Sequence, residues 1–426
     1  MAPTRTGSKR LLHDLNQSIV FNLIVGQQAI SRTELAKRSG LPAATITRIV
    51  GNFLTAGLIS EVTSEESSGG RRPVLLSINA TAGYVVGVKL REDGMTVTVC
   101  DLSCTPVRAG EHAIQPGDEP HHVVDAIADT IKRLIAEAGI SMRQVLGVGV
   151  GLSGLIDSSR GLCRLSSILD WHNVELGPAL QFKLHVPVRV DNDVNTLAVA
   201  ERYFGAGRDI GNFLLITVGR GVGLGIVVGG EIYRGTHGGA GEFGHMTVDT
   251  SANAPLCNCG KRGCLEAVAS DYGILRAATG TDPGHHVEDT IGDLVERAQQ
   301  GDSAMGAIFQ RAGSTLGIAI ANLINIFDPA RILISGEGLR AGDLILDPIR
   351  ATISQHIFGV RDSIDLVVCP IDDTHWARGA ASLILHEVFQ PPIYEDEEAL
   401  VIDDLLSQAA QTNGQKRRKE RSSSTI

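Results

Sequence analysis

The 426-residue sequence lacks the features of a membrane or secreted protein. No run of apolar residues approaches the roughly 18 needed to cross a bilayer. The opening stretch, MAPTRTGSKRLLHDLNQ, has charge but no apolar core, so we do not expect a signal peptide. The seven cysteines are odd in number and mostly scattered, which argues against a disulfide framework. We therefore expect a cytoplasmic protein that makes no membrane contact.

Aromatic residues are scarce, at 4%, whereas glycine is frequent, with 49 residues. A single hydrophobic core stops growing at about 250–300 residues, so a chain of this length should fold into two or three domains. Frequent glycine favours an α/β protein with tight turns and close approaches between backbone segments.

Charge is unevenly distributed along the chain. Residues 1–79 hold nine basic and five acidic side chains, a net charge of +4, so the remainder holds −14 of a chain with net charge −10. A small basic module attached to a large acidic body predicts nucleic-acid contact at one end only.

Residues 30–59, ISRTELAKRSGLPAATITRIVGNFLTAGLI, have the pattern of a helix-turn-helix. Ser31 caps the first helix, Gly40 makes the turn, and Pro42 stands at the start of the second helix, where a missing N–H is tolerated. The inward stripe of the second helix is Ile46, Ile49, Val50 and Phe53. The residues left to face DNA are Ala43, Ala44, Thr45, Thr47 and Arg48.

The following stretch, LISEVTSEESSGGRRPVLLSIN, predicts two short strands around a glycine-rich loop, with Arg71 and Arg72 at its base. A generic helical hairpin with a solvated charged face is the alternative. The turn, the proline start and the wing together favour DNA binding. The second helix would then enter the major groove, and the wing arginines would meet phosphate or the minor groove.

From residue 80 onward, strands alternate with helices. YVVGVKL and MTVTVCDL predict one hairpin, and NFLLITVGRGVGLGIVVGGEIYRG predicts a second, later one with a glycine turn. Two lobes, each opened by a glycine-containing hairpin, are typical of the fold shared by sugar kinases and actin.

A winged helix joined to GVGLSGLID, VDNDVNTLA, GGAGEFGHMTV, CNCGKRGCLE and HWARGAASL resembles the ROK family (repressors, open reading frames and sugar kinases) over about residues 10–390. The resemblance implies an α/β protein with a winged helix-turn-helix at residues 1–79 and a two-lobed, actin-like (ribonuclease H-like) fold. Lobe I would span 80–190, completed by a closing helix at 375–390. Lobe II, with a sugar and zinc site, would span 191–374. We expect residues 391–426 to form a largely disordered tail.

The cysteines of CNCGKRGCLE lie close together in the sequence. A bridge between Cys257 and Cys259 would close a small, strained ring, and the C-x-x-C of redox pairs is absent. With His245, the three thiols form a closed set that suits Zn²⁺ and leaves no position for a catalytic water. We therefore expect a structural zinc bound by His245, Cys257, Cys259 and Cys264.

The resemblance also implies a monosaccharide site. The positions that match sugar-contacting residues of ROK proteins are Asn192, Asp193, Glu242, His245 and Glu266, with Gly154 of LSGLID against the sugar ring. Carboxylates suit this role because each accepts two hydroxyl hydrogen bonds.

Asp193 matches the general base of ROK kinases, but the phosphate-binding pattern departs from theirs. Lys89 stands at the position of an acid in the first hairpin, and Arg220 replaces a hydroxyl in the second. Phosphoryl transfer depends on positioning and charge neutralisation, so these changes should abolish it. We therefore expect a non-enzymatic homodimer or homotetramer that binds operator DNA and a sugar effector. A sugar kinase bearing a winged helix is the alternative.

Overall fold

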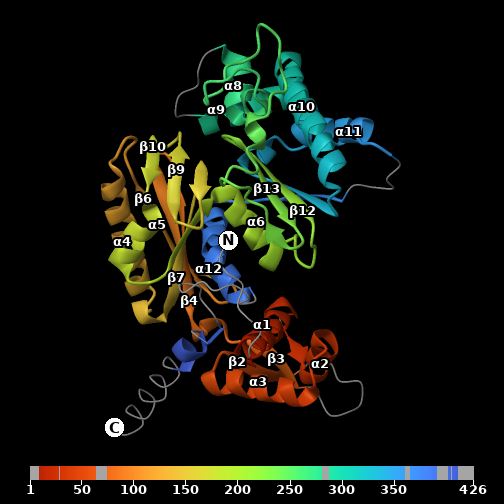
Figure 1. The fold of residues 1–426 in the computed structure, drawn as a ribbon. Coiled ribbons are helices and arrows are strands. Elements are labelled where there is room, and N and C mark those ends of the chain that lie inside the picture. Colours follow the sequence, from red (N-terminus) through yellow and green to blue (C-terminus); the bar gives the residue numbers. More distant parts are fainter. Residues whose placement is uncertain are drawn as a thin grey trace. The chain divides into compact units, whose positions relative to one another are not determined.

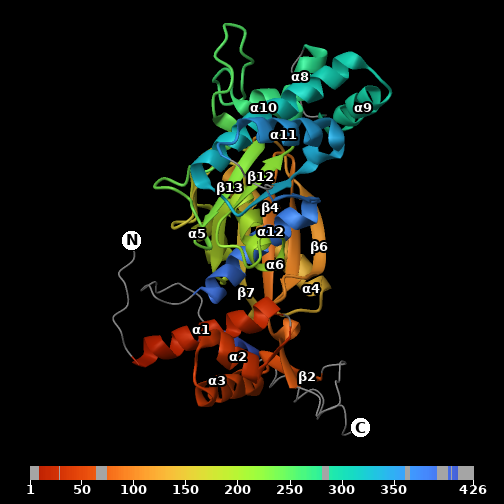
Figure 2. The same cartoon turned by 90° about the vertical axis from the view of Figure 1, so that its right-hand side faces the viewer.

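The computed structural model describes residues 9–27, 29–63, 74–280, 287–359, 365–390, 402, 403 and 405–410. The chain divides into two compact units. Unit 1 contains residues 1–152, 157–203 and 376–426, and unit 2 contains residues 153–156 and 204–375. Figure 1 and Figure 2 label the elements of both units.

The N-terminal part of unit 1 is a winged helix-turn-helix, as expected. Its three-stranded sheet has the order β1-β3-β2. The elements, in chain order, are α1 (Lys9–Gln27), β1 (Ile30–Ser31), α2 (Arg32–Ser39), α3 (Ala43–Ala56), β2 (Ile59–Thr63) and β3 (Val74–Ile78). Helix α1 was not expected; it contacts α2, α3 and β3.

The local signals of the helix-turn-helix act as predicted. The Ser31 hydroxyl accepts a hydrogen bond from the backbone N–H of Glu34, and Gly40 ends α2 with a left-handed φ of 69°. The predicted inward residues of α3 are all buried: Ile46, Ile49, Val50 and Phe53. Burial of this stripe leaves the opposite face of α3 exposed.

The larger part of unit 1 is a five-stranded sheet with the order β11-β7-β4-β5-β6. Its strands are β4 (Tyr84–Leu90), β5 (Gly94–Asp101), β6 (Pro106–Ala113), β7 (Val145–Leu152) and β11 (Val188–Asn192). In Figure 1, α4 (Pro120–Glu137) and α5 (Leu176–Leu184) lie on one side of this sheet and α12 (Asp373–Phe389) lies on the other. A smaller sheet consists of β8 (Leu155–Asp157), β9 (Leu162–Ser166) and β10 (Trp171–Val174).

Unit 2 repeats the topology of the first large sheet, with the order β14-β13-β12-β15-β16. In each unit an antiparallel hairpin (β4–β5 or β12–β13) continues through two parallel strands. The strands are β12 (Phe213–Val218), β13 (Val222–Val228), β14 (Glu231–Ile232), β15 (Arg331–Ser335) and β16 (Leu366–Cys369). The predicted pair of hairpins in a two-lobed α/β fold is therefore confirmed.

In the described part of unit 2, the sheet is accompanied by α7 (Leu265–Ala269), α8 (Asp271–Thr279), α9 (Val287–Gln299), α10 (Ser303–Phe327) and α11 (Asp343–His356). Among the described helices, α10 alone is long and apolar enough to span a membrane. Because 56% of that apolar stretch is buried and α10 packs against α11 and α7, it is the central core helix of this unit.

The division into units differs from the expected domain boundaries. The segment 191–203, expected in lobe II, belongs to unit 1, because α6 (Asp193–Phe204) packs against α12. Residues 153–156 and 375, expected in lobe I, belong to unit 2. Part of the expected disordered tail is also folded. Residues 402, 403 and 405–410 are helical, with Ile402, Leu405 and Ala409 buried.

Helix α12 lies directly on the backbone of β4 and β7 because both strands carry glycine where it crosses. A Cβ atom at Gly87 would lie 1.8 Å from the carbonyl oxygen of Ala377, and one at Gly149 would lie 1.8 Å from that of Ala380. Either side chain would force the helix away from the sheet.

We predict that Gly149→Ala lowers the free energy of unfolding by about 2–4 kcal/mol, because the added methyl overlaps backbone that cannot move independently. Gly306→Ala in α10 is the control. A Cβ there meets nothing within 4 Å, so the substitution should be neutral or stabilise by up to about 1 kcal/mol. Urea denaturation of both variants tests this expectation, and equal midpoints would contradict the close packing of α12.

Candidate metal centre and sugar-binding residues

The candidate zinc ligands lie on two loops and one helix start in unit 2. His245 ends a short 3-10 turn (Phe243–His245), and Cys264 caps the N-terminus of α7. Cys257 and Cys259 lie in a tight turn closed by two backbone hydrogen bonds, from Gly260 N–H to the Cys257 carbonyl and from Cys257 N–H to the Lys261 carbonyl. This turn brings the sulfurs of Cys257 and Cys259 to the same cluster.

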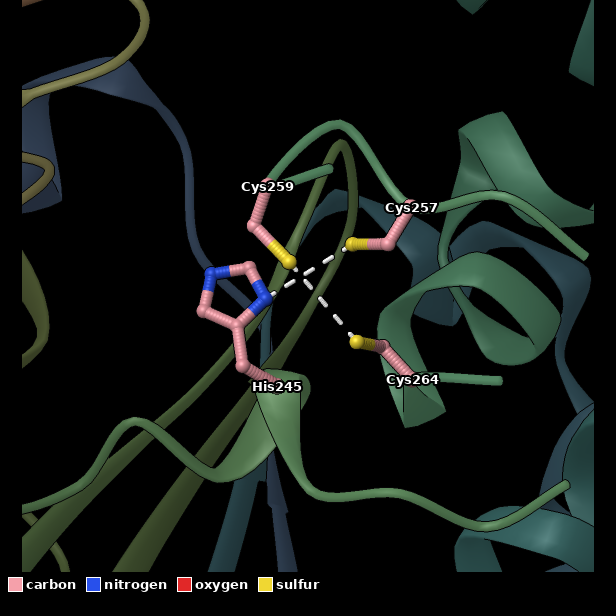
Figure 3. A group of neighbouring side chains, drawn as sticks. All are labelled: His245, Cys257, Cys259 and Cys264. Atoms are coloured by element: carbon pink, nitrogen blue, oxygen red, sulfur yellow. Dashed lines mark hydrogen bonds between the residues drawn. The ribbon is translucent and has the colours of Figure 1, made fainter. Parts of the chain in front are cut away.

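The four side chains converge, as predicted, and their ligand atoms all lie within 4.8 Å of one another (Figure 3). The Cys259 and Cys264 sulfurs are 3.7 Å apart, and the Cys257 sulfur is 3.6 Å from His245 Nδ1. In a tetrahedral zinc site with ordinary bond lengths, two sulfurs are about 3.8 Å apart and a sulfur and a nitrogen about 3.6 Å apart. The residues therefore fit Zn²⁺.

The three thiols of the cluster differ: burial raises the pKa values of Cys257 and Cys264, whereas hydrogen bonds lower the pKa of Cys259. Burial raises the pKa of the Cys257 thiol to about 12, and the negative charge of Glu266 acts in the same direction. Thiols with raised pKa values keep their protons near neutral pH, so metal binding must displace protons from the cluster. Zinc affinity should consequently fall as pH is lowered.

The two ring nitrogens of His245 have different neighbours. Its Nδ1 points to the cysteine cluster, while its Nε2 lies 3.8 Å from a carboxylate oxygen of Glu242. A metal on Nδ1 would fix the ring and direct Nε2 toward Glu242. This arrangement lets one histidine belong to both predicted sets, the metal ligands and the sugar-binding residues.

Glu266 joins the metal cluster to the second glycine hairpin. Its Oε2 accepts a hydrogen bond from Val222 N–H at 3.2 Å, and its Oε1 lies 3.8 Å from the Cys257 sulfur. The predicted sugar residues of unit 2 therefore include three neighbours of one cluster, Glu242, His245 and Glu266. Gly154 lies in the turn between β7 and β8, where its φ of 130° favours glycine.

The predicted sugar residues of unit 1, Asn192 and Asp193, lie where β11 passes into α6. The Asp193 carboxylate accepts a hydrogen bond from Val194 N–H through Oδ1 and forms an ion pair with Lys89 of β4 through Oδ2. Both side chains of the pair are only 11% exposed. The Lys89 ammonium also lies 4.6 Å from the centre of the Trp376 ring, within range of a cation–π interaction.

The charged side chains at the turn of the second glycine hairpin differ from those of a phosphate-binding turn. Arg220 donates a hydrogen bond to the Tyr272 hydroxyl at 3.1 Å. A Cβ at Gly219 would lie 2.4 Å from a carboxylate oxygen of Glu337, so that carboxylate lies against the turn. A negative charge at this position would repel the phosphates of a nucleotide.

The candidate DNA-binding residues lie on the accessible face of α3. Ala43, Ala44, Thr47 and Arg48 are exposed, and Thr45 is partly exposed. Arg71 and Arg72 fall outside the described residues, although β2 and β3, which flank them, pair as predicted for a wing. The role of these α3 residues and of Arg71 and Arg72 in DNA binding stays a prediction.

Two residues with a direct bearing on the site were missed from the sequence, Trp376 and Glu337. Trp376 is one of only two tryptophans and lies inside the HWARGAASL motif, so its rarity was an available signal. Glu337 had no such signal, because its proximity to Gly219 arises from pairing between β12 and β15, which are distant in the sequence.

Comparison with known proteins agrees with this geometry. Residues 85–387 match the ROK family. Over 372 residues the chain is 29% identical to the xylose repressor of Bacillus spizizenii, a similarity that covers 87% of this chain and 95% of the repressor.

Two solved structures are similar to different extents of the chain. A ROK family transcriptional regulator, described as a homologue of the E. coli MLC protein, is 28% identical, with a TM-score of 0.76 and coverage of 94% of this chain and all of its own. A ROK family glucokinase from Streptomyces griseus, in complex with glucose and AMPPNP, is 29% identical, with a TM-score of 0.58. The glucokinase covers 71% of this chain and 99% of its own.

The fold, the duplicated hairpins and the matched segment define a two-lobed protein of the sugar-kinase type joined to a winged helix. The chain belongs to the ROK family.

We predict about one zinc per chain in the purified protein by elemental analysis. Cys259→Ser should lose the metal and weaken sugar binding, because His245 would no longer be fixed. Cys369→Ser, in β16 and outside the cluster, should retain both. Retention of full sugar affinity by a metal-free protein would contradict the positioning role.

Proposed function

We propose that this protein is a sugar-responsive, DNA-binding transcriptional repressor of carbohydrate-metabolism genes, with a structural zinc and a nucleotide site that no longer supports phosphoryl transfer. The proposal is supported by similarity to a repressor and to a ROK regulator over nearly the whole chain. The glucokinase, in contrast, matches only 71% of the chain.

DNA binding is supported by the exposed face of α3. Helix α3 buries one stripe in its own domain and exposes small side chains and an arginine on the opposite face. Such a helix is suited to the major groove. Arg48 offers a bidentate donor for a guanine edge, whereas Arg71 and Arg72 of the wing would contact phosphate or the minor groove.

Sugar binding is supported by the donors and acceptors at the predicted positions of each unit. Asn192 and Asp193 in one unit, and Glu242, His245 and Glu266 in the other, offer side-chain groups that hydrogen-bond sugar hydroxyls. A hydroxyl missing from the wrong sugar would leave one of these groups unpaired, which would disfavour its binding. Zn²⁺ would hold the His245 ring and would not take part in chemistry.

The observation that carries the proposal is the ion pair between Lys89 and Asp193. A general base must accept a proton from the sugar hydroxyl, but Oδ2 of this carboxylate is held by the Lys89 ammonium and Oδ1 by Val194 N–H. The same ammonium stands where a kinase has an acid near its metal, so it would repel the metal. Asp193 is therefore suited to bind a hydroxyl and poorly suited to deprotonate it.

A sugar kinase remains the second candidate, because a ROK glucokinase shares this fold and Asp193 is retained. Purified wild-type protein distinguishes the two functions in an ATP-consumption assay with D-glucose, D-xylose and N-acetyl-D-glucosamine. Robust hexose phosphorylation that is lost in Asp193→Asn would overturn the regulator and establish the kinase.

The response would operate by linkage in a cytoplasmic homodimer or homotetramer. A sugar that binds one arrangement of the two units more tightly shifts the population toward it. In an oligomer, that shift changes the spacing or orientation of two winged helices and hence the affinity for operator DNA.

We predict that a monosaccharide raises the melting temperature of the protein without ATP and changes its affinity for an operator selected from random duplexes. Glu242→Ala should bind the operator as tightly as the wild type but ignore the sugar. Glu296→Ala, on the exposed face of α9, is the matched control and should respond normally. A Glu242→Ala variant with a full sugar response would remove Glu242 from the site.

We predict that Arg48→Ala weakens operator binding by about 1–3 kcal/mol if Arg48 contacts a base edge. The loss should be specific to the operator and small on unrelated DNA, because base contacts specify and phosphate contacts do not. Arg350→Ala on α11 should leave binding unchanged. Fluorescence anisotropy with both duplexes gives the affinities. An unaltered operator affinity would exclude Arg48 from recognition.

A further inference from the structure

Helix α12 extends from the Lys89–Asp193 pair to the winged helix. Trp376, near its start, stacks on the Lys89 ammonium, and Phe389 is its last residue. The two positions are thirteen residues apart in the helix, a rise of about 20 Å along its axis. One rigid element therefore contacts both Lys89, the ion-pair partner of Asp193, and the DNA-binding domain.

Helix α6 runs from the same site and packs closely against α12. It begins with Asp193 itself. A Cβ at Gly379 of α12 would lie 3.2 Å from the backbone of Leu197, and the Ser382 hydroxyl lies 3.4 Å from the Thr196 carbonyl oxygen. With so little space between the two backbones, a displacement of α6 cannot be absorbed by side-chain rearrangement.

The far end of α6 is joined to the far end of α12 by an aromatic and polar contact. The Tyr203 ring lies 5.1 Å from the Phe389 ring, and its hydroxyl lies 3.0 Å from His386 Nδ1. The Gln390 amide nitrogen, which can only donate, lies 2.9 Å from His386 Nε2. His386 therefore joins Tyr203 of α6 to Gln390 through its two ring nitrogens.

From Phe389 the aromatic contacts continue into the DNA-binding domain. The Phe389 ring lies 5.7 Å from Phe21 of α1, and Phe21 lies 5.9 Å from Phe53 of α3 in an edge-to-face arrangement. All three rings are buried. Asn22 of α1 also donates a hydrogen bond to the Phe389 carbonyl oxygen. Figure 1 and Figure 2 both show the end of α12 beside α1.

The chain also passes between the two units at these helices. Unit 1 gives way to unit 2 after Tyr203, at the end of α6, and resumes at Trp376, near the start of α12. The end of α6 and the start of α12 therefore each adjoin a crossing of the chain between the units.

We propose that the packed pair α6–α12 transmits sugar binding to the recognition helix α3, with Tyr203 and Phe389 as the positioning residues that join it to α1. The inference rests on the proposed function. A hydroxyl bound to Asp193 acts on α6 directly and on α12 through Lys89 and Trp376. The two helices move together as a shear element, and α1 transfers the displacement to α3 through the contact between Phe21 and Phe53.

The test compares operator affinity with and without a saturating sugar, found by screening D-glucose, D-xylose and N-acetyl-D-glucosamine. The ratio of the two affinities measures the coupling. Phe389→Leu should bring this ratio about three- to tenfold closer to one, while sugar affinity measured without DNA stays near the wild-type value. Tyr203→Phe, which removes only the hydroxyl, should reduce the ratio in the same direction by a smaller factor.

Phe309→Leu is the matched control, because Phe309 is equally buried in α10 of unit 2 and has the same change in volume. It should lower the melting temperature as Phe389→Leu does but keep the wild-type ratio. If Phe389→Leu and Tyr203→Phe both keep the wild-type ratio, the transmission route is wrong although the proposed function stands. If no sugar changes the operator affinity of the wild type, the proposed function itself fails, and the route fails with it.

Discussion

The close approach of α12 to the backbone of β4 and β7 is the constraint on which the unit 1 site depends. Two glycines, Gly87 and Gly149, make this approach possible. Because the helix lies directly on the sheet, Trp376 reaches the Lys89 ammonium on β4, and Gly379 reaches the backbone of α6. Larger residues at the glycine positions would separate the elements that hold Asp193.

Packing of this kind also explains how a buried charge pair is tolerated. Lys89 and Asp193 lose solvation on burial, and removing either partner would leave an isolated charge at a cost of about 3–5 kcal/mol. The aromatic face of Trp376 and the N–H of Val194 supply further contacts to the two charges. The pair is therefore stable only as a set, which keeps the Asp193 carboxylate in a fixed orientation.

Much of the fold was predictable from the sequence because its signals are local. Capping by Ser31, the turn at Gly40 and the buried stripe of α3 follow from neighbouring residues, and the same holds for the spacing of the three cysteines. The ion pair of Lys89 with Asp193 was not predictable, since 104 residues separate the partners and only sheet register joins them. The helix α1 was not predicted, although its buried residues Val20, Phe21 and Ile24 have helical spacing in the sequence. Its contacts with Phe53 and Phe389, which lie far along the chain, carry no local signal.

The same physical account separates a kinase from a regulator built on one fold. A kinase uses sugar-binding energy to align the hydroxyl with a phosphate, so its base must be free to take a proton. A regulator needs instead that the sugar bind two arrangements of the protein with different affinities. In the proposed function, the Lys89 ammonium disfavours the first use, because it already holds the Asp193 carboxylate. It would favour the second use, because Lys89 also contacts α12, the helix that reaches the DNA-binding domain. One charged side chain at the first hairpin would then account for both the absence of phosphoryl transfer and the link to α12.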